Sequence, residues 1–284
     1  ELIFKARLEN IQLDNLHLAD KMKHSYLSFN IDADFTGNNI DNAEGFLRID
    51  SIDFIREDKV FQMNKLLVEA SNDSIGKKLK LSSDIVTGEI IGQYSLLTIG
   101  NSILQTLHPY LPALIKANNK KKPIDGTNNL SYTFKVNNTE AISDILALPF
   151  TVISPTKIIG FYDENRNKFK TEIFAPSVKA AGMQIQSGYV YAENADDKIK
   201  TQIDALIVGK KANNTVSLKS DIGSNLVQTN ISLQNDGLQK AKGEFSISTL
   251  FTKIDKEPLR IDINTLPSEL LLNNAKWRME KSHI

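Results

Sequence analysis

Four histidines, the side chains that most often act as general bases, are scattered along the chain without a catalytic or metal-binding pattern. They are His17, His24, His108 and His283. None stands in an H-x-x-x-H or H-E-x-x-H spacing, and none lies near a serine-bearing nucleophile turn. The chain contains no cysteine, which excludes a thiolate nucleophile, thiolate metal ligands and disulfides. We therefore interpret the histidines as structural or surface residues.

Carboxylates are abundant, but they occupy turns or alternate with apolar residues. Asp32, Asp34, Asp204 and Asp262 are of the second kind. Catalysis by two carboxylates requires a pair that converges in a cleft, about 5–9 Å apart. Alternation points these side chains toward solvent instead, so the sequence favours a solvated polar face.

The stretch DENRNK (163–168) begins like a calcium-binding loop, with Asp163, Asn165 and Asn167 at alternate positions. The EF-hand pattern also requires glycine at its sixth position and glutamate at its twelfth. Those positions hold Lys168 and Phe174, so a hairpin turn explains the stretch better. Glycine-rich phosphate loops are absent as well. The sequence thus predicts no enzyme, no catalytic residue, no metal site and no cofactor.

Charge and composition narrow the class of partner. The 34 basic and 34 acidic residues cancel to a formal net charge of zero, whereas nucleic-acid binding needs a clustered excess of Lys and Arg. No stretch approaches the roughly 20 apolar residues that span a bilayer, and no signal peptide is visible. The chain opens inside an apparent strand, ELIFKARL. We therefore expect an excised piece of a longer protein that does not bind nucleic acid.

Strand patterns dominate the elements that would position any site. In LSYTFKVNN (130–138) apolar and polar residues alternate, which gives a strand one apolar face and one polar face. The pattern recurs at short intervals, and turn-like stretches such as ENADD (193–197) join the strands. Such short links predict antiparallel neighbours. In FLRIDSIDF (46–54) the alternation slips by one residue, which predicts a β-bulge.

Two amphipathic segments interrupt the strands. Residues 95–117 carry leucine and isoleucine at helical spacing, and Pro109 and Pro112 must kink or split that helix. Residues 138–148 read as a second, short helix.

We divide the chain into a β-groove segment that ends in the kinked helix (1–117), a polar linker (118–129) and a second β-groove segment (130–284). Whether one sheet continues across the linker is open at this point.

Two architectures accept a meander with one apolar face. A closed β-sandwich packs two such faces together about 10 Å apart, and base rates favour it. We expect the other architecture, a mainly β fold in which one long curled antiparallel sheet surrounds a groove. Near-local turns, mostly aliphatic apolar positions with only 7% aromatic residues, and the two covering segments favour it. The predicted groove-lining residues are Phe29, Ile31, Phe35, Leu81, Ile85, Tyr132, Phe134, Phe169, Ile173, Ile185, Ile203 and Ile231.

Two stretches together resemble a known family. They are GFLRIDSIDFIREDKVFQMNKLLVEASND (45–73) and LKLSSDIVTGEIIGQYSLLTIGNSILQTLHPYLPAL (79–114). They resemble the Bacteroidota form of TamB, the AsmA-like translocation and assembly module. The pattern of that family is a G-x-L-x-V-D-S-L-D-F strand, a D-K-x-F, an L-x-S-D…G-x-Y strand pair and a helix ending near Y-L-P. Residues 45–150 carry most of the match. Neither the family's N-terminal membrane anchor nor its C-terminal region is visible, so the resemblance indicates an internal fragment.

The resemblance implies a long β-groove in the periplasm, in a parent protein anchored in the inner membrane. It implies passage of phospholipids between the inner and outer membranes, with acyl chains as the bound group. A second implied role is to help assemble outer-membrane β-barrels with an Omp85-type partner, as a scaffold or chaperone that presents strand edges. A third reading, independent of the resemblance, is a closed β-sandwich module such as an adhesin or a carbohydrate binder.

Overall fold

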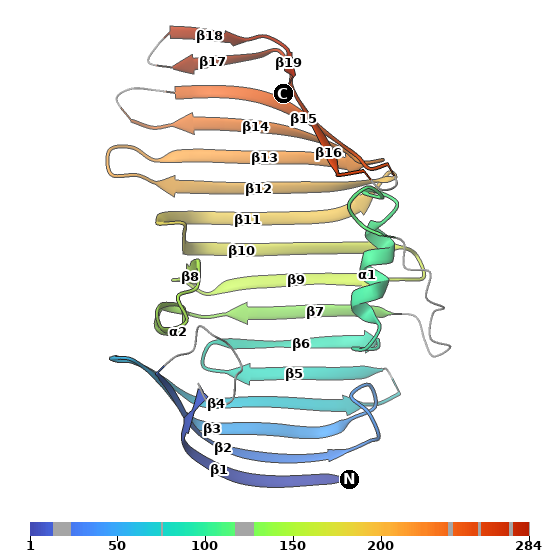
Figure 1. The fold of residues 1–284 in the computed structure, drawn as a ribbon, viewed down its shortest axis with the longest axis vertical. Coiled ribbons are helices and arrows are strands. Elements are labelled where there is room, and N and C mark those ends of the chain that lie inside the picture. The colour runs from blue at the N-terminus through green and yellow to red at the C-terminus, as the bar shows by residue number, and fades with distance from the viewer. Residues whose placement is uncertain are drawn as a thin grey trace.

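The computed structural model describes residues 1–13, 24–74, 76–116, 128–237, 241–254, 257–272 and 275–283. In this part of the chain a single antiparallel sheet of 19 strands is accompanied by two short helices, and the sheet does not close into a barrel (Figure 1). The expected fold class, a long curled antiparallel sheet with one or two short helices, is confirmed.

Strands and helices follow one another in a simple order. The strands before the second half of the chain are β1 (Leu2–Gln12), β2 (Ser25–Thr36), β3 (Glu44–Arg56), β4 (Lys59–Asn72), β5 (Lys77–Ser83), β6 (Val86–Gln93) and β7 (Asn129–Val136). They are followed by β8 (Phe150–Val152), β9 (Thr156–Asp163), β10 (Lys168–Ala180), β11 (Met183–Ala195), β12 (Lys198–Val208), β13 (Asn214–Gly223), β14 (Leu226–Asn235), β15 (Ala241–Thr252), β16 (Arg260–Thr265), β17 (Ser268–Leu272), β18 (Ala275–Met279) and β19 (Ser282–His283). The helices are α1 (Ile99–Leu107) and α2 (Glu140–Ile145).

From β1 to β15 each strand pairs with the next, except that β7 pairs with β9 while the short β8 lies beside the end of β10. The sheet is continuous because β6 and β7 pair along their whole length. The two predicted segments therefore belong to one sheet. Residues 117–127, most of the predicted linker, lie outside the described residues. Asn128 is buried and Asn129 begins β7.

Local backbone conformation keeps the apolar residues on one side of the sheet. Ser51 has a φ of 54°, and the register of β3 with β2 shifts beside it. The bulge predicted within FLRIDSIDF is thereby confirmed, and it lets Ile49 and Ile52 face the same side. Asn10 in β1 and Ser187 in β11 also have positive φ at register shifts. These residues correct the alternation where the sequence slips.

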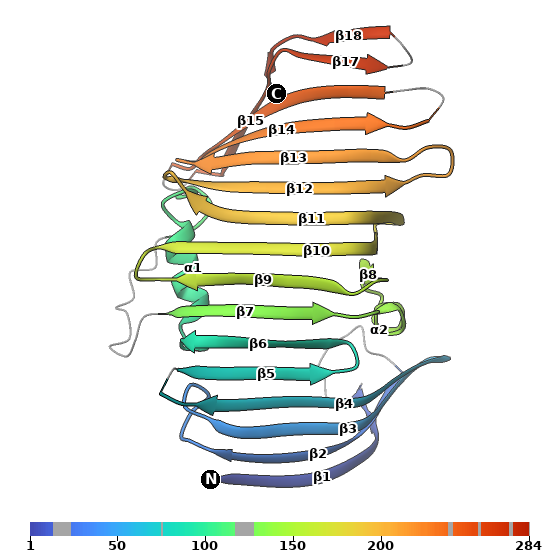
Figure 2. The ribbon, with the colours of Figure 1, turned by 180° about the vertical axis from the view of Figure 1, so that it is seen from behind.

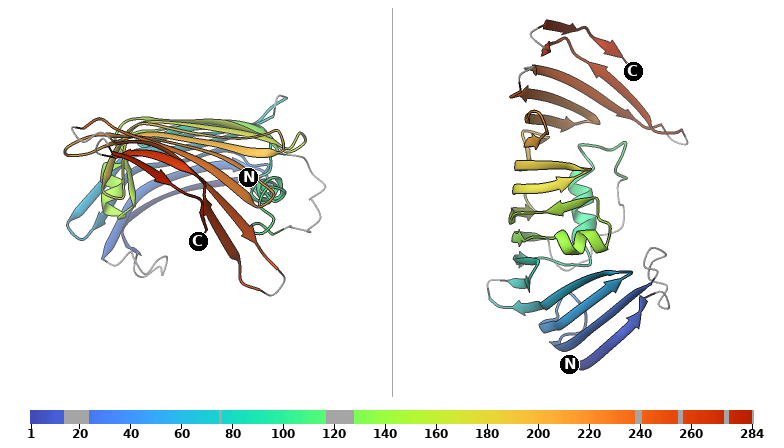
Figure 3. Two further views of the ribbon diagram at one scale, coloured as in Figure 1. Left: turned by 90° about the horizontal axis from the view of Figure 1, so that it is seen from above. Right: turned by 90° about the vertical axis from the view of Figure 1, so that its left-hand side faces the viewer.

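The sheet forms a single layer. The chain exposes 18224 Å² of surface, whereas a compact monomer of this mass is expected to expose about 12,000 Å². Figure 3 shows the strands bending toward one side, with both helices on that concave side. The same helices lie in front of the strands in Figure 1 and behind them in Figure 2. A second sheet facing the first is absent from the described residues, so the β-sandwich reading is wrong.

The two helices are shorter than the predicted segments. In 95–117 regular helix ends at Leu107, ahead of Pro109 and Pro112, and the chain continues in turns to Ile115. In 138–148 only α2 is helical, and the Asn138 side chain accepts a hydrogen bond from the Glu140 N–H at 2.7 Å.

Each helix covers a small core at one edge of the concave side. Under α2, Phe54 and Phe61 pack with Ile145. Beside α1, Tyr94 packs with Leu130 and Tyr162. The face between these two clusters has no covering element in the described part of the chain, as Figure 1 shows.

Candidate functional site

A row of apolar residues crosses the concave face from β1 to β15. Each of its members is the direct cross-strand partner of the next, so the row runs along the long axis of the sheet. Its members, one per strand without β8, are Phe4, Ala33, Leu47, Val68, Leu81, Gly88, Phe134, Ile158, Ile173, Val190, Ile203, Leu218, Ile231 and Phe245. We call this set the central row. At about 4.8 Å per strand it is roughly 60 Å long.

All of the predicted groove-lining residues belong to the concave side. Leu81, Phe134, Ile173, Ile203 and Ile231 are members of the central row. By register and alternation, the neighbouring rows hold Phe29, Ile31, Phe35, Tyr132, Phe169 and Ile185. Ile85 lies in the turn after β5 and packs against the α2 core. None of them is buried: all are partly exposed, and Ile203 is 42% exposed. Whether they bind lipid stays a prediction.

The carboxylate side chains of the strands are segregated to the convex side of the sheet. By register and alternation, no aspartate or glutamate of the described strands projects from the concave side. On the convex side charges pair across strands, as in Lys78–Glu89 at 2.7 Å and Lys80–Glu69 at 3.6 Å. The candidate carboxylates Asp32, Asp34, Asp204 and Asp262 are on this side too. An apolar ligand on the concave side would therefore meet no carboxylate of these strands.

Glycines lower the floor of the concave side beside β7. A Cβ atom at Gly88 would overlap the Phe134 ring, and one at Gly160 would overlap the Tyr132 ring. Both rings thus lie across the neighbouring strand instead of projecting upward. The Tyr132 hydroxyl is 2.6 Å from Thr171 Oγ1 and forms a hydrogen bond with it. The floor stays apolar because this hydroxyl already has a partner.

Helix α1 is oriented with its polar side toward the sheet. Ser102 and Thr106 are its buried residues. Thr106 Oγ1 and the Tyr162 hydroxyl are 2.9 Å apart, and the Asn128 amide donates to Ser102 Oγ at 3.0 Å. Burial raises the pKa of Tyr162, so this hydroxyl stays neutral around physiological pH. An ordinary surface helix packs its apolar side inward, whereas α1 turns these polar residues inward together with Ile99, which packs against the same core.

The apolar side of α1 instead borders a cleft. Ile99, Ile103 and Leu107, spaced four residues apart, line it from the helix. The floor is formed by apolar and aromatic side chains of β6, β7, β9 and β10, among them Leu130 and Phe169. The cleft has a volume of about 470 Å³. We call it the α1 cleft.

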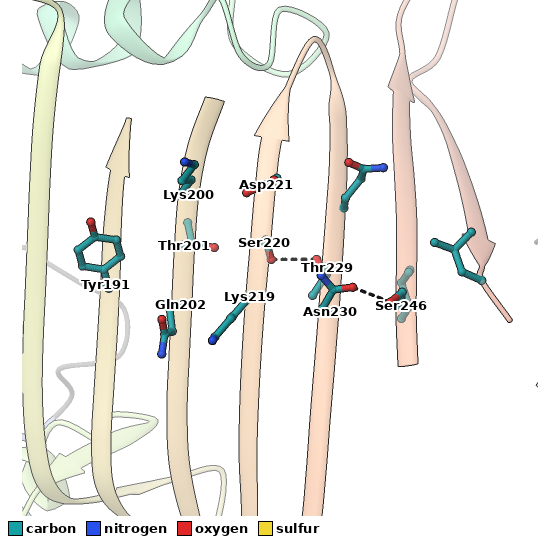
Figure 4. Close-up of a pocket in the computed structure, with 13 residues that line it drawn as sticks. Tyr191, Lys200, Thr201, Gln202, Lys219, Ser220, Asp221, Thr229, Asn230 and Ser246 are labelled. Carbon is teal, nitrogen blue, oxygen red and sulfur yellow. Dashed lines mark hydrogen bonds between the residues drawn. The ribbon is translucent and has the colours of Figure 1, made fainter. Parts of the chain in front are cut away.

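The convex side has a polar depression of about 400 Å³ over β11 to β15 (Figure 4). Its walls include Gln202, Lys219 and Asn230, from successive strands. Asn230 accepts a hydrogen bond from Ser246 Oγ at 2.5 Å. A hydrogen bond to Glu193, aided by burial, raises the pKa of Tyr191 to about 12. We interpret this depression as a polar surface, because several of its side chains already bond to polar neighbours, as in Ser220–Thr229 and Lys200–Asp196.

The residues first considered for catalysis lie far apart. His24 lies in the turn before β2, the His108 ring contacts the Ile115 carbonyl at 2.6 Å, and the His283 ring contacts Asn264 at 2.9 Å. His17 lies outside the described residues. Within the described ranges, no group of three or more metal-ligating side chains gathers.

DENRN is the turn that links β9 to β10, where the Arg166 N–H donates to Asp163 at 3.0 Å. None of the helices in the described ranges has the length and apolar content needed to cross a membrane.

Sequence reasoning missed the polar docking of α1. Ser102 and Thr106 stand four residues apart, beside the stripe of Ile99, Ile103 and Leu107 on the helix surface, and this spacing was a usable signal. It gave no indication of the partners, since Asn128 and Tyr162 come from distant parts of the chain.

Comparisons of the chain with protein-family models, with curated proteins and with solved structures found no match. The resemblance to TamB therefore has only the sequence pattern of residues 45–150 to support it.

Proposed function

We propose that this chain is a non-enzymatic lipid-binding segment whose concave face shields phospholipid acyl chains in transit between two membranes. The observation that carries the proposal is the central row, an unbroken apolar path on a side from which no carboxylate of the described strands projects. Neighbouring members of the row are one strand spacing apart, about 4.8 Å. An acyl chain that slides along the row therefore leaves one apolar side chain as it reaches the next, and at Gly88 the ring of Phe134 supplies the contact.

The free energy of exposing an acyl chain to water supports a path of this kind. Exposing an acyl chain to water costs about 0.8 kcal/mol per methylene, hence about 12 kcal/mol for a 16-carbon chain. A protein surface that covers half of the acyl chain recovers about 6 kcal/mol of this cost. A closed core would not serve, because the site must stay open for a polar headgroup to remain in water.

The cellular setting is a further part of the proposal. The TamB resemblance favours a periplasmic location, a parent protein anchored in the inner membrane and an Omp85-type partner at the outer membrane. In that setting the long axis of the sheet would lie along the direction of transport.

Site-specific photocrosslinking tests the proposal, because adjacent residues of one strand face opposite sides. We would place a benzophenone amino acid at Ile203 or Ile231, and at the matched convex positions Gln202 or Asn230. After irradiation in a diderm bacterium, mass spectrometry of the purified protein should find phospholipid adducts at 203 and 231 only. Absence of adducts at all positions, or equal yields on both sides, would refute the function.

A second proposed role, strand-edge binding to outer-membrane β-barrel clients, is favoured by β1. Among the described strands β1 pairs with β2 alone, and Leu2, Ile3 and Phe4 are exposed along it. Free strand edges bind extended peptides through backbone hydrogen bonds. Client binding that survives removal of lipid, and that is lost when proline replaces Phe4, would support this role. Binding that disappears with the lipid would contradict it.

A further inference from the structure

We propose that the α1 cleft is a resting site for one acyl chain of a phospholipid, with the phosphate of its headgroup at Lys77. This inference rests on the proposed function and adds where along the sheet a lipid pauses and which charge its headgroup carries. It is argued from the orientation of α1, the length of the cleft and the charges on the concave side.

The orientation of α1 leaves part of its apolar side exposed at the cleft. The hydrogen bonds of Ser102 and Thr106 fix the polar side of the helix to the sheet. Ile103 is 39% exposed although it borders an apolar floor. An acyl chain between this side of α1 and the floor would cover both surfaces at once.

The cleft has the length of a single lipid tail. It extends from β6 to β10, and Lys77 on β5 lies in the same row as Leu130 and Phe169, which line the cleft. From β5 to β10 this row covers about 19 Å at about 4.8 Å per strand. A lipid tail occupies about 15 Å, half of the ~30 Å hydrocarbon core of a bilayer.

Charge at the β5 end identifies the headgroup. By register and alternation, the charged side chains that project from the concave side in the described strands include Arg56, Lys59 and Lys77, and Lys179 at the end of β10 pairs with Glu140 of α2 at 3.5 Å; all four are cations. Lys59 is paired with Asp144 on α2 at 2.9 Å, and Arg56 donates to the Ile145 carbonyl of α2 at 2.9 Å. Lys77 is the cation of this group on the α1 side.

The Lys77 ammonium has capacity for an anion. It donates to the Tyr94 carbonyl at 2.7 Å and lies 5.8 Å from the centre of the Tyr94 ring. Tyr94 packs with Ile90 and Ile99, both of which line the α1 cleft. An ammonium has three donors, so the neutral carbonyl leaves two donors for an anion. The Asp41 carboxylate near Tyr94 is held by hydrogen bonds from Ser95 Oγ and the Leu96 N–H, both at 2.6 Å. A phosphate at this end of the cleft would satisfy the two remaining donors of Lys77.

The experiment compares three probes on the intact chain: a 16-carbon lysophosphatidate, the monoacylglycerol of the same chain length, and inorganic phosphate. Calorimetric titration below the critical micelle concentration gives each affinity. Lysophosphatidate should bind at least about fivefold more tightly than monoacylglycerol, as expected for one partly screened ion pair. Inorganic phosphate should not bind measurably, because the acyl chain of the lipid supplies most of the affinity.

Variants separate the contribution of the acyl chain to the affinity from that of the headgroup. Lys77→Met should abolish the preference for lysophosphatidate without changing the affinity for monoacylglycerol, and Lys77→Arg should keep the preference. Ile103→Trp should fill the cleft and weaken both lipids at least tenfold. The matched control Leu104→Trp should leave both affinities unchanged, since Leu104 is on the same helix, is 47% exposed and does not line the cleft. Thermal unfolding verifies that each variant folds.

An unchanged preference in Lys77→Met, or a lost preference in Lys77→Arg, would overturn the headgroup assignment. Unchanged affinities in Ile103→Trp would overturn the cleft. If lipid adducts still form at Ile203 and Ile231 in that case, the proposed function stands and this inference alone fails. If neither adducts nor binding are found, both fail.

Discussion

Replacing Ile203 with aspartate distinguishes an open apolar face from a closed core. Ile203 lies in the middle of the central row, with Val190 and Leu218 as its cross-strand partners. Because 42% of it is exposed, burial contributes about 1.5 kcal/mol, roughly 60% of the ~2.5 kcal/mol for a fully buried isoleucine. The lower strand preference of aspartate adds about 0.5–1 kcal/mol. We therefore expect a loss of about 2 kcal/mol in the free energy of unfolding.

Urea denaturation measures this loss, and the lipid adducts at Ile231 report function in the same variant. The matched variant is Ile145→Asp, which places a charge at a residue of α2 that is only 2% exposed. We expect it to cost 4 kcal/mol or more, because the carboxylate would replace a fully buried side chain among Phe54 and Phe61. Ile203→Asp should keep the fold and strongly reduce lipid adducts. Equal destabilisation by the two variants would refute the open-face reasoning.

Three further predictions concern the floor, α1 and the convex side. Gly160→Val should displace the Tyr132 ring and lower stability in urea by about 1–3 kcal/mol, and an unchanged midpoint would contradict the flat floor. Asn128→Ala should cost about 2 kcal/mol through lost buried hydrogen bonds, whereas its exposed neighbour Asn129→Ala should cost less than about 0.5 kcal/mol. Similar losses for both would contradict the anchoring of α1. Tyr191, with its pKa raised to about 12, contributes stability that is complete below pH ~10 and is lost as the pH rises toward 12. Tyr191→Phe should remove this part of the alkaline slope and the high-pH step in tyrosine absorbance, and a normal titration near pH 10 would contradict it.

The sequence indicated the two faces of the sheet well. Because side chains of a strand alternate strictly, residues such as Phe134 and Ile173 could be assigned to one side without knowing their neighbours. The slip at Ser51 was readable for the same reason, since only a bulge keeps both halves of β3 in phase.

What could not be predicted depends on register and on long-range contacts. The central row exists only because every hairpin aligns one apolar position with the next, and turn geometry decides that alignment. Asn128 belonged to a stretch expected to be a polar linker, yet it is 1% exposed and bonds to Ser95, Ser102 and Glu164. Its burial follows from partners 26 to 36 residues away, which a local pattern does not reveal.

Pairing between successive strands makes the molecule modular in length. Since β11 to β14 form consecutive antiparallel pairs, removing the hairpin β12–β13 would leave β11 and β14 in the correct orientation to join. Val190 would then meet Ile231, and the apolar path would stay unbroken while becoming about 10 Å shorter. Removing one strand alone would bring two parallel neighbours together. Such a sheet can therefore match the distance that it must bridge by gaining or losing whole hairpins.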